Sequence, residues 1–106
     1  MTQLTHASRH IVFHDQNAAE LSICGGIEGS VQRCAGNLRE TSGRAGSALF
    51  MLRAVDSGRG ATIDVTKDRW EQCVRAARAV CPTGSLRSVC IGAASSGDVA
   101  FSLEAR

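Results

Sequence analysis

The stretch TKDRWEQCVRAARAVC, residues 66–81, decides the fold because it carries the clearest helix signal in the chain. Its apolar side chains recur at helical spacing and form one stripe, which consists of Trp70, Cys73, Val74, Ala77, Val80 and Cys81. Thr66 is a favourable N-cap, and Asp68 complements the positive end of the helix dipole. Pro82 and Gly84 are typical helix terminators. The pattern predicts an amphipathic helix that packs on the core of a globular domain.

Strand-like segments stand on both sides of this helix. The most apolar run, residues 47–55, predicts a central strand that is covered at least in part on both faces. Residues 61–65 alternate in polarity, and the turn-forming residues 56–60 join them to the central strand, so we expect a β-hairpin with a long loop. After the helix, residues 86–91 and 99–103 each predict a further strand.

The first part of the chain has a second set of signals. Residues 11–13 are a short β-rich run, and residues 20–24 alternate as a half-buried strand does. A helix is expected from Ser30 to Glu40, because Val31, Cys34, Ala35 and Leu38 would share one face. Residues 41–46 have the composition of a loop.

From residue 20 to residue 91 the predicted order is strand, helix, strand, strand, helix, strand. This order is typical of the ferredoxin-like split βαβ sandwich, an α+β fold in which an antiparallel sheet carries both helices on one face. Residues 11–13 and 99–103 would add strands at the two ends. The length of 106 residues fits a single domain, 1–106, in which residues 1–17 form an N-terminal extension or an edge strand.

The composition limits the classes of binding partner and the cellular compartment that we expect for this protein. The net charge of +2 and the aromatic content of 4% disfavour a nucleic-acid partner. No apolar run has the roughly 20 residues that a membrane helix needs, and residues 1–10 are too polar for a signal peptide. We therefore expect no membrane contact and a cytoplasmic localisation.

The five cysteines are odd in number and contain no C-x-x-C pair. In a cytoplasmic protein this pattern predicts neither a complete disulfide framework nor a zinc ribbon. Cys34 and Cys73 fall on apolar helix faces and are expected to be small core residues. Cys24 adjoins a glycine-rich loop, where a reactive thiol is the alternative interpretation.

Three histidines, His6, His10 and His14, are spaced by four residues. In a strand, residues four apart are separated by roughly 13 Å, which is too far for one metal ion. We therefore predict no metal site there, and nothing in the sequence implies a cofactor.

The segment GGIEGSVQR, residues 25–33, has the composition of an anion-binding loop between a strand and a helix. Glycines let the backbone approach a ligand closely, and the first amides of a helix favour negative charge. Arg33, one turn into the expected helix, can donate two hydrogen bonds to a phosphate or a carboxylate.

This loop and the element order resemble the acylphosphatase family, whose loop has the form G-x-V-Q-G-V-x-F-R. Gly25, Ile27, Gly29 and Arg33 match that pattern. The resemblance implies that the amides of Gly29, Ser30 and Val31, together with the guanidinium of Arg33, bind the phosphate of an acyl phosphate. Arg33 would then be the catalytic residue, acting by electrostatic stabilisation.

Three positions depart from the family pattern. Glu28 replaces a Gln, Gln32 replaces a Phe, and Ala54 stands where the family has the Asn that positions the attacking water. The resemblance therefore implies binding of a phosphate-bearing small molecule and leaves acyl-phosphate hydrolysis open. The alternative is a small regulatory or inhibitor protein that acts through protein contacts, as a monomer or a homodimer.

Overall fold

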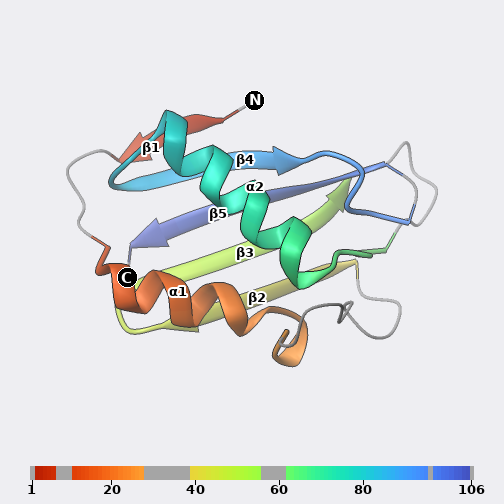
Figure 1. Ribbon diagram of the computed structural model, residues 1–106, viewed down its shortest axis with the longest axis horizontal. Helices are drawn as coiled ribbons and strands as arrows, with labels where there is room; N and C mark the ends of the chain where they lie inside the picture. The colour runs from red at the N-terminus through yellow and green to blue at the C-terminus, as the bar shows by residue number, and fades with distance from the viewer. Residues whose placement is uncertain (1, 7–10, 28–38, 56–61, 96, 106) are drawn as a thin grey trace.

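The computed structural model describes residues 2–6, 11–27, 39–55, 62–95 and 97–105 (Figure 1). In chain order the elements are β1 (Gln3–His6), α1 (Phe13–Leu21), a short 3-10 turn η1 (Ile23–Gly25), β2 (Glu40–Ala45), β3 (Ala48–Val55), α2 (Lys67–Val80), β4 (Ser85–Cys90) and β5 (Asp98–Ala105).

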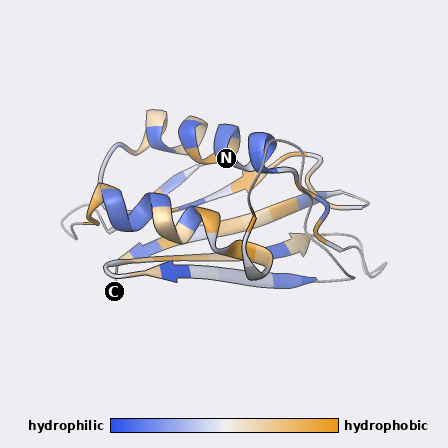
Figure 2. Cartoon of the chain, turned by 60° about the horizontal axis from the view of Figure 1, so that its bottom comes forward, coloured by the Kyte–Doolittle hydropathy of each residue, from blue (hydrophilic) through white to orange (hydrophobic). Residues whose placement is uncertain are grey.

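The five strands form one open sheet in the order β1-β4-β5-β3-β2, and every neighbouring pair is antiparallel. Both helices lie on the same side of this sheet (Figures 1 and 2). The α+β class predicted from the sequence is therefore confirmed, with two helices over an antiparallel sheet. In the described segments no helix is long and apolar enough to cross a bilayer.

The core lies between the helices and the sheet. β3 and β5 alternate buried and more exposed residues, as strands with one covered face do. Phe50 of β3, Trp70 of α2 and Phe101 of β5 meet at its centre, with Trp70 edge-on to both phenyl rings at centroid distances of 5.2 and 4.9 Å. This geometry is favourable for aromatic pairs and joins the second helix to the middle of the sheet.

The helix predicted at residues 66–81 is confirmed as α2. The hydroxyl of Thr66 accepts a hydrogen bond from the backbone N–H of Arg69, as an N-cap does. Trp70, Val74 and Ala77 are buried on one face. The strands predicted at 86–91 and 99–103 are confirmed as β4 and β5, with ends that differ by one or two residues.

The first part of the chain was predicted wrongly. Residues 20–24 end α1 and enter η1 instead of forming a strand, and the expected strand at 11–13 runs into the first residue of α1. The physical reason is that short apolar runs do not distinguish a strand from a helix. In addition, α1 buries Gln16 and Glu20 with Ala19, so its sequence carries no apolar stripe.

The hairpin was also placed wrongly. β2 pairs with β3 through a tight turn at Gly46 and Ser47, so the expected loop at 41–46 is mostly a strand. Of the segment 61–65, Ile63 makes only an isolated bridge to Ala94. Gly43 suits β2 because α1 passes so close that a Cβ at this position would clash with the backbone oxygen of Ala19.

Two further expectations concern the segments next to this hairpin. β3 was expected to be covered at least in part on both faces; the helices cover one face, whereas on the other face Met51 is 50% exposed. Most of the helix expected at 30–40 falls in 28–38, outside the described residues, and Glu40 belongs to β2.

Candidate functional site

The residues of the predicted anion site, Gly29, Ser30, Val31 and Arg33, all lie outside the described residues. The segment before these residues forms α1 and the 3-10 turn η1, whereas the acylphosphatase resemblance implied a strand there. Ile27 is buried, and its N–H donates to the carbonyl oxygen of Leu21 at 2.9 Å. The anion site therefore stays a prediction.

Ala54, at the position aligned with the water-positioning Asn, is buried in β3. Its N–H donates to the carbonyl oxygen of Arg39 at 2.8 Å, so its amide extends the pairing of β3 beyond β2. Because Phe50 and Leu52 are buried on the same alternation, Ala54 faces the core beneath the helices.

The sheet face opposite the helices, called the open face below, is the clearest candidate for a contact surface. No described element covers it, and it is hollowed by a depression of about 950 Å³ that β1, β2, β3, β4 and β5 line together. Its exposed side chains include Met51 and Arg53 of β3, and Arg87 and Val89 of β4.

Strand pairing sets the open-face residues in rows across the sheet. Val89, Ala100, Arg53 and Glu40 form one row from β4 to β2. The next row is Gln3, Arg87, Ser102, Met51 and Ser42, and the third is Glu104, Leu49 and Arg44. Rows are separated by two residues along each strand, or roughly 7 Å.

Charges of both signs alternate across this face. Arg53 lies directly across from Glu40 in the β2–β3 pair. Arg87 lies across from Ser102, two residues before Glu104 on β5. The apolar Met51 and Val89 lie among these charges, and the two aromatic residues of the described strands, Phe50 and Phe101, are buried in the core instead of standing on this face.

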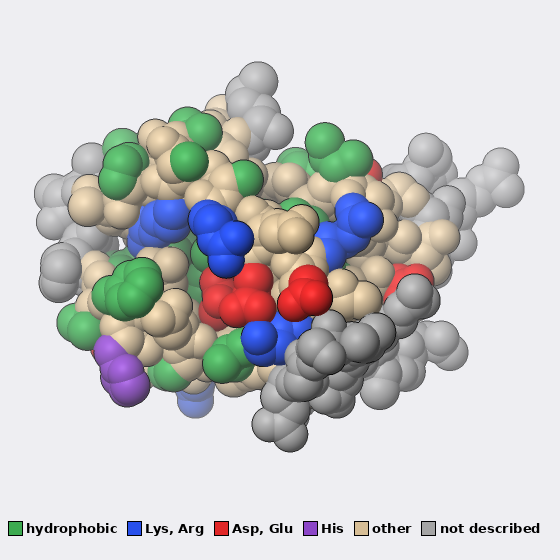
Figure 3. Space-filling view, viewed as in Figure 1, with side chains coloured by type: hydrophobic (Ala, Val, Ile, Leu, Met, Phe, Trp, Pro, Cys, Tyr) green, Lys and Arg blue, Asp and Glu red, His purple; other side chains and the backbone are tan. Residues whose placement is uncertain are grey.

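A second cluster of charge lies on the helix side of the molecule. Figure 3 shows acidic side chains gathered between the two helices, with basic side chains on either side. Glu20 of α1 is only 8% exposed there, and the N–H of the Trp70 indole donates to its backbone oxygen at 2.9 Å. Glu71 lies nearby and forms an ion pair with Lys67 at 2.8 Å.

Burial raises the pKa of Glu20 to about 7, and the negative charge of Glu71 adds to this effect. Lys67 and Arg75 oppose the increase without cancelling it. Glu20 therefore changes its charge near neutral pH. Sequence reasoning missed this residue because residues 20–24 were interpreted as a half-buried strand.

Polar contacts also hold the first half of α1, at the adjacent residues Asp15 and Gln16. Arg78 of α2 donates to the Gln16 side chain at 3.0 Å and to the backbone oxygens of Cys81 and Gly84. At the start of α1, the Asp15 carboxylate accepts hydrogen bonds from the N–H and hydroxyl of Ser47, both at 2.8 Å. These bonds hold the pKa of Asp15 below its usual value.

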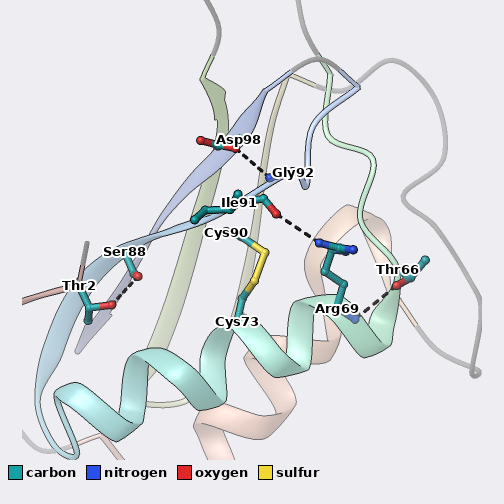
Figure 4. The surroundings of a disulfide bond; sticks show 9 residues. All are labelled: Thr2, Thr66, Arg69, Cys73, Ser88, Cys90, Ile91, Gly92 and Asp98. Carbon is teal, nitrogen blue, oxygen red and sulfur yellow. Dashed lines mark hydrogen bonds between the residues drawn. A yellow bond between two sulfur atoms is a disulfide. The ribbon is translucent and has the colours of Figure 1, made fainter.

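The cysteines differ from expectation. Cys73 of α2 and Cys90 of β4 form a disulfide with a Cα–Cα distance of 5.6 Å (Figure 4). Cys24 is also disulfide-bonded, so the interpretation of this residue as a reactive thiol is wrong. Cys81 is a free and buried thiol. The pairing was missed because Cys73 and Cys90 are 17 residues apart and meet only when α2 packs on β4.

His6 and His14 belong to different elements of the described segments. His14 is exposed on α1, His6 belongs to β1, and His10 lies outside the described residues. Among the described residues, no group of three or more His, Cys, Asp or Glu side chains is arranged to hold a metal ion.

Comparison with protein-family models, with curated proteins and with solved structures finds no match for this chain.

Proposed function

We propose that this protein acts by binding another protein chain through the open face of its sheet. The observation that carries the proposal is the depression on this face, in which exposed apolar side chains lie among alternating charges. Protein interfaces combine an apolar centre with Arg-rich polar surroundings, and Met51 and Val89 with Arg53 and Arg87 provide this combination.

The chemistry of the open face favours protein over nucleic acid. Glu40 and Glu104 would repel phosphates, and the nearest aromatic rings are in the core. The proposal corresponds to the second function expected from the sequence, a small non-catalytic protein that acts through contacts.

The compartment belongs to the same proposal. Disulfides persist in oxidising compartments and are rare in the cytoplasm, so the Cys73–Cys90 bond supports an oxidising location in place of the cytoplasmic one expected from the sequence. Peptide mapping of the protein isolated from its natural source without reductant tests this point. A Cys73–Cys90 cross-linked peptide is expected, and free thiols at both positions would contradict it.

The finer fold assignment is also a proposal. β3 and β4 run in the same direction with β5 between them, and α2 connects them, so β3-α2-β4 is a split βαβ unit. This unit and the order strand, helix, strand, strand, helix, strand support the ferredoxin-like class. β5 follows as an additional central strand.

A photo-crosslinking amino acid placed at Met51 tests the binding function in the cells that make the protein. The matched control carries the same amino acid at Gln72, which is exposed on α2 on the opposite side of the molecule. We expect a protein adduct from position 51 and none from position 72. An adduct from neither position, or equal adducts from both, would contradict a role for the open face.

A further inference from the structure

We propose that Arg53 and Arg87 together bind one carboxylate, carried by a glutamate or aspartate side chain of the partner protein, at the centre of the open face. The inference rests on the proposed function, because it names the group that the same surface recognises. Two arginines suit such a ligand, since each guanidinium can donate parallel hydrogen bonds to carboxylate oxygens.

The strand pairing places the two arginines at opposite corners of a small area of the sheet. β5 lies between β4 and β3, and its two middle open-face residues are Ala100 and Ser102 (Figure 1). Arg53 on β3 pairs with Ala100, and Arg87 on β4 pairs with Ser102. Two strand spacings, roughly 10 Å, and one row, roughly 7 Å, therefore separate the arginines, which is roughly 12 Å along the diagonal.

The midpoint of this diagonal, called the central point below, lies above Ala100 and Ser102. It is roughly 6 Å from the Cα atom of each arginine, a distance that the long side chain of arginine spans. Ala100 and Ser102 have small side chains, which leave room for a ligand, and the Ser102 hydroxyl can add a further donor. Both of them line the depression in the open face, as the two arginines do. The geometry therefore lets both guanidiniums contact one anion.

Within the described residues, the chain itself does not use these donors. The side chains of Arg53, Arg87 and Ser102 form no hydrogen bond and no ion pair there. Two arginines of α2 differ, because Arg69 and Arg78 donate hydrogen bonds to other parts of the chain. The donors of the open face are therefore available to a partner.

The acidic residues of the open face lie farther from the central point. Glu40 is two strands from β5, and Glu104 and Asp98 lie on β5 one and a half rows away, so each Cα atom is roughly 10 Å from that point. The Asp98 carboxylate also accepts a hydrogen bond from the N–H of Gly92 at 2.8 Å (Figure 4). Because the Coulomb energy falls with distance, the two nearer arginines dominate, and the central point is positive.

The other two corners of this area are apolar, which favours a carboxylate on an aliphatic arm. Val89 pairs with Ala100, and Met51 pairs with Ser102. Both apolar side chains are exposed, so they can cover the methylene groups of a glutamate or an aspartate. A phosphate carries a larger negative charge and is repelled more strongly by the three acidic residues. The site therefore fits an acidic side chain better than a phosphate.

An NMR titration of the full chain tests this site with two small probes, the N-acetyl N-methylamides of glutamate and of glutamine. The first carries the side-chain carboxylate, and the second is its neutral analogue. We expect the glutamate compound to shift the amide signals of Ala100 and Ser102 saturably, and the glutamine compound to leave them unchanged. Arg53→Gln and Arg87→Gln should each weaken the binding about tenfold, because each removes charge-assisted hydrogen bonds.

Arg44→Gln is the matched control, because Arg44 is exposed on the same face two strands and one and a half rows from the central point, roughly 14 Å away. It should bind the probe as the wild type does. A missing shift, an equal shift with the glutamine compound, or equal losses in Arg44→Gln and Arg53→Gln would each overturn the inference. Tighter binding of inorganic phosphate at the same signals would overturn the assignment to a carboxylate.

The crosslinking experiment at Met51 distinguishes this failure from that of the proposed function. With the photo-crosslinking amino acid at position 51, Arg87→Gln should reduce the yield of the adduct several-fold, and Arg44→Gln should leave it unchanged. An undiminished adduct in Arg87→Gln overturns the carboxylate site and keeps the open face as the binding surface. No adduct without either substitution contradicts the proposed function itself.

Discussion

Replacing Glu20 by Gln should make the protein more stable at pH 8 and leave its stability near pH 4 unchanged. Burial and the neighbouring Glu71 raise the pKa of Glu20 from 4.5 to about 7. In the folded protein this carboxyl therefore holds its proton over a pH range in which the unfolded chain has released it. Between these two values the folded state binds more protons, so its stability falls as pH rises.

The magnitude follows from the size of the shift. An increase from 4.5 to about 7, at 1.36 kcal/mol for each pH unit, corresponds to about 3 kcal/mol of stability. This contribution is fully present below pH 4.5 and is lost as pH rises through 7. Glutamine has the shape of the protonated carboxyl and carries no charge, so Glu20→Gln avoids the loss and should exceed the wild type by about 3 kcal/mol at pH 8.

Urea unfolding at a series of pH values, followed by the fluorescence of Trp70, measures this difference. Comparing variant with wild type at each pH removes the contribution of every other titrating group. Glu104→Gln is the matched control, because it makes the same chemical change at an exposed position of the sheet. A Glu20→Gln difference that stays constant from pH 4 to pH 8 would refute the reasoning.

The remaining predictions concern the core, the disulfide, the close contact of α1 and the anion loop. Phe101→Ala should lower the free energy of unfolding by about 3–5 kcal/mol in urea titrations, because it removes a ring packed on the central tryptophan; a loss below about 1 kcal/mol would contradict that packing. Cys73→Ala with Cys90→Ala should cost about 2–4 kcal/mol, measured by thermal unfolding without reductant, and equal melting temperatures would show that the bond adds no stability. Gly43→Ala should destabilise by more than about 1 kcal/mol, since its Cβ would meet backbone atoms of α1, and unchanged urea unfolding would exclude this close approach. If the loop binds anions, phosphate should shift its amide NMR signals and Arg33→Ala should abolish the shifts, whereas no shift in the wild type would end the anion-site prediction.

The open face shows why the candidate site could not be predicted from the sequence. Leu49 and Met51 are as apolar as Phe50 and Leu52, so residues 48–55 do not show the alternation of a strand with one exposed face. Hydropathy predicted a strand covered at least in part on both faces. Which face of β3 is exposed depends on the two helices, because both pack on the other face of the sheet.

The sequence by itself determined α2, β3, β4 and β5. Each has a signal within its own residues: a helical apolar stripe with an N-cap and a terminating proline for α2, and short runs of β-forming residues for the strands. Local periodicity is sufficient there, because tertiary packing agrees with local preference.

Only the tertiary structure decided α1, β2 and the pairing of the cysteines. α1 buries the polar residues Gln16 and Glu20. Gln16 can be buried because Arg78, which is distant in the chain, donates a hydrogen bond to its side chain. Gly43 belongs to a strand because the backbone of α1 occupies the space of a side chain. Cys73 and Cys90 bond because α2 packs on β4. In each case the deciding contact joins residues far apart in the chain, so the pattern of neighbouring residues does not predict it.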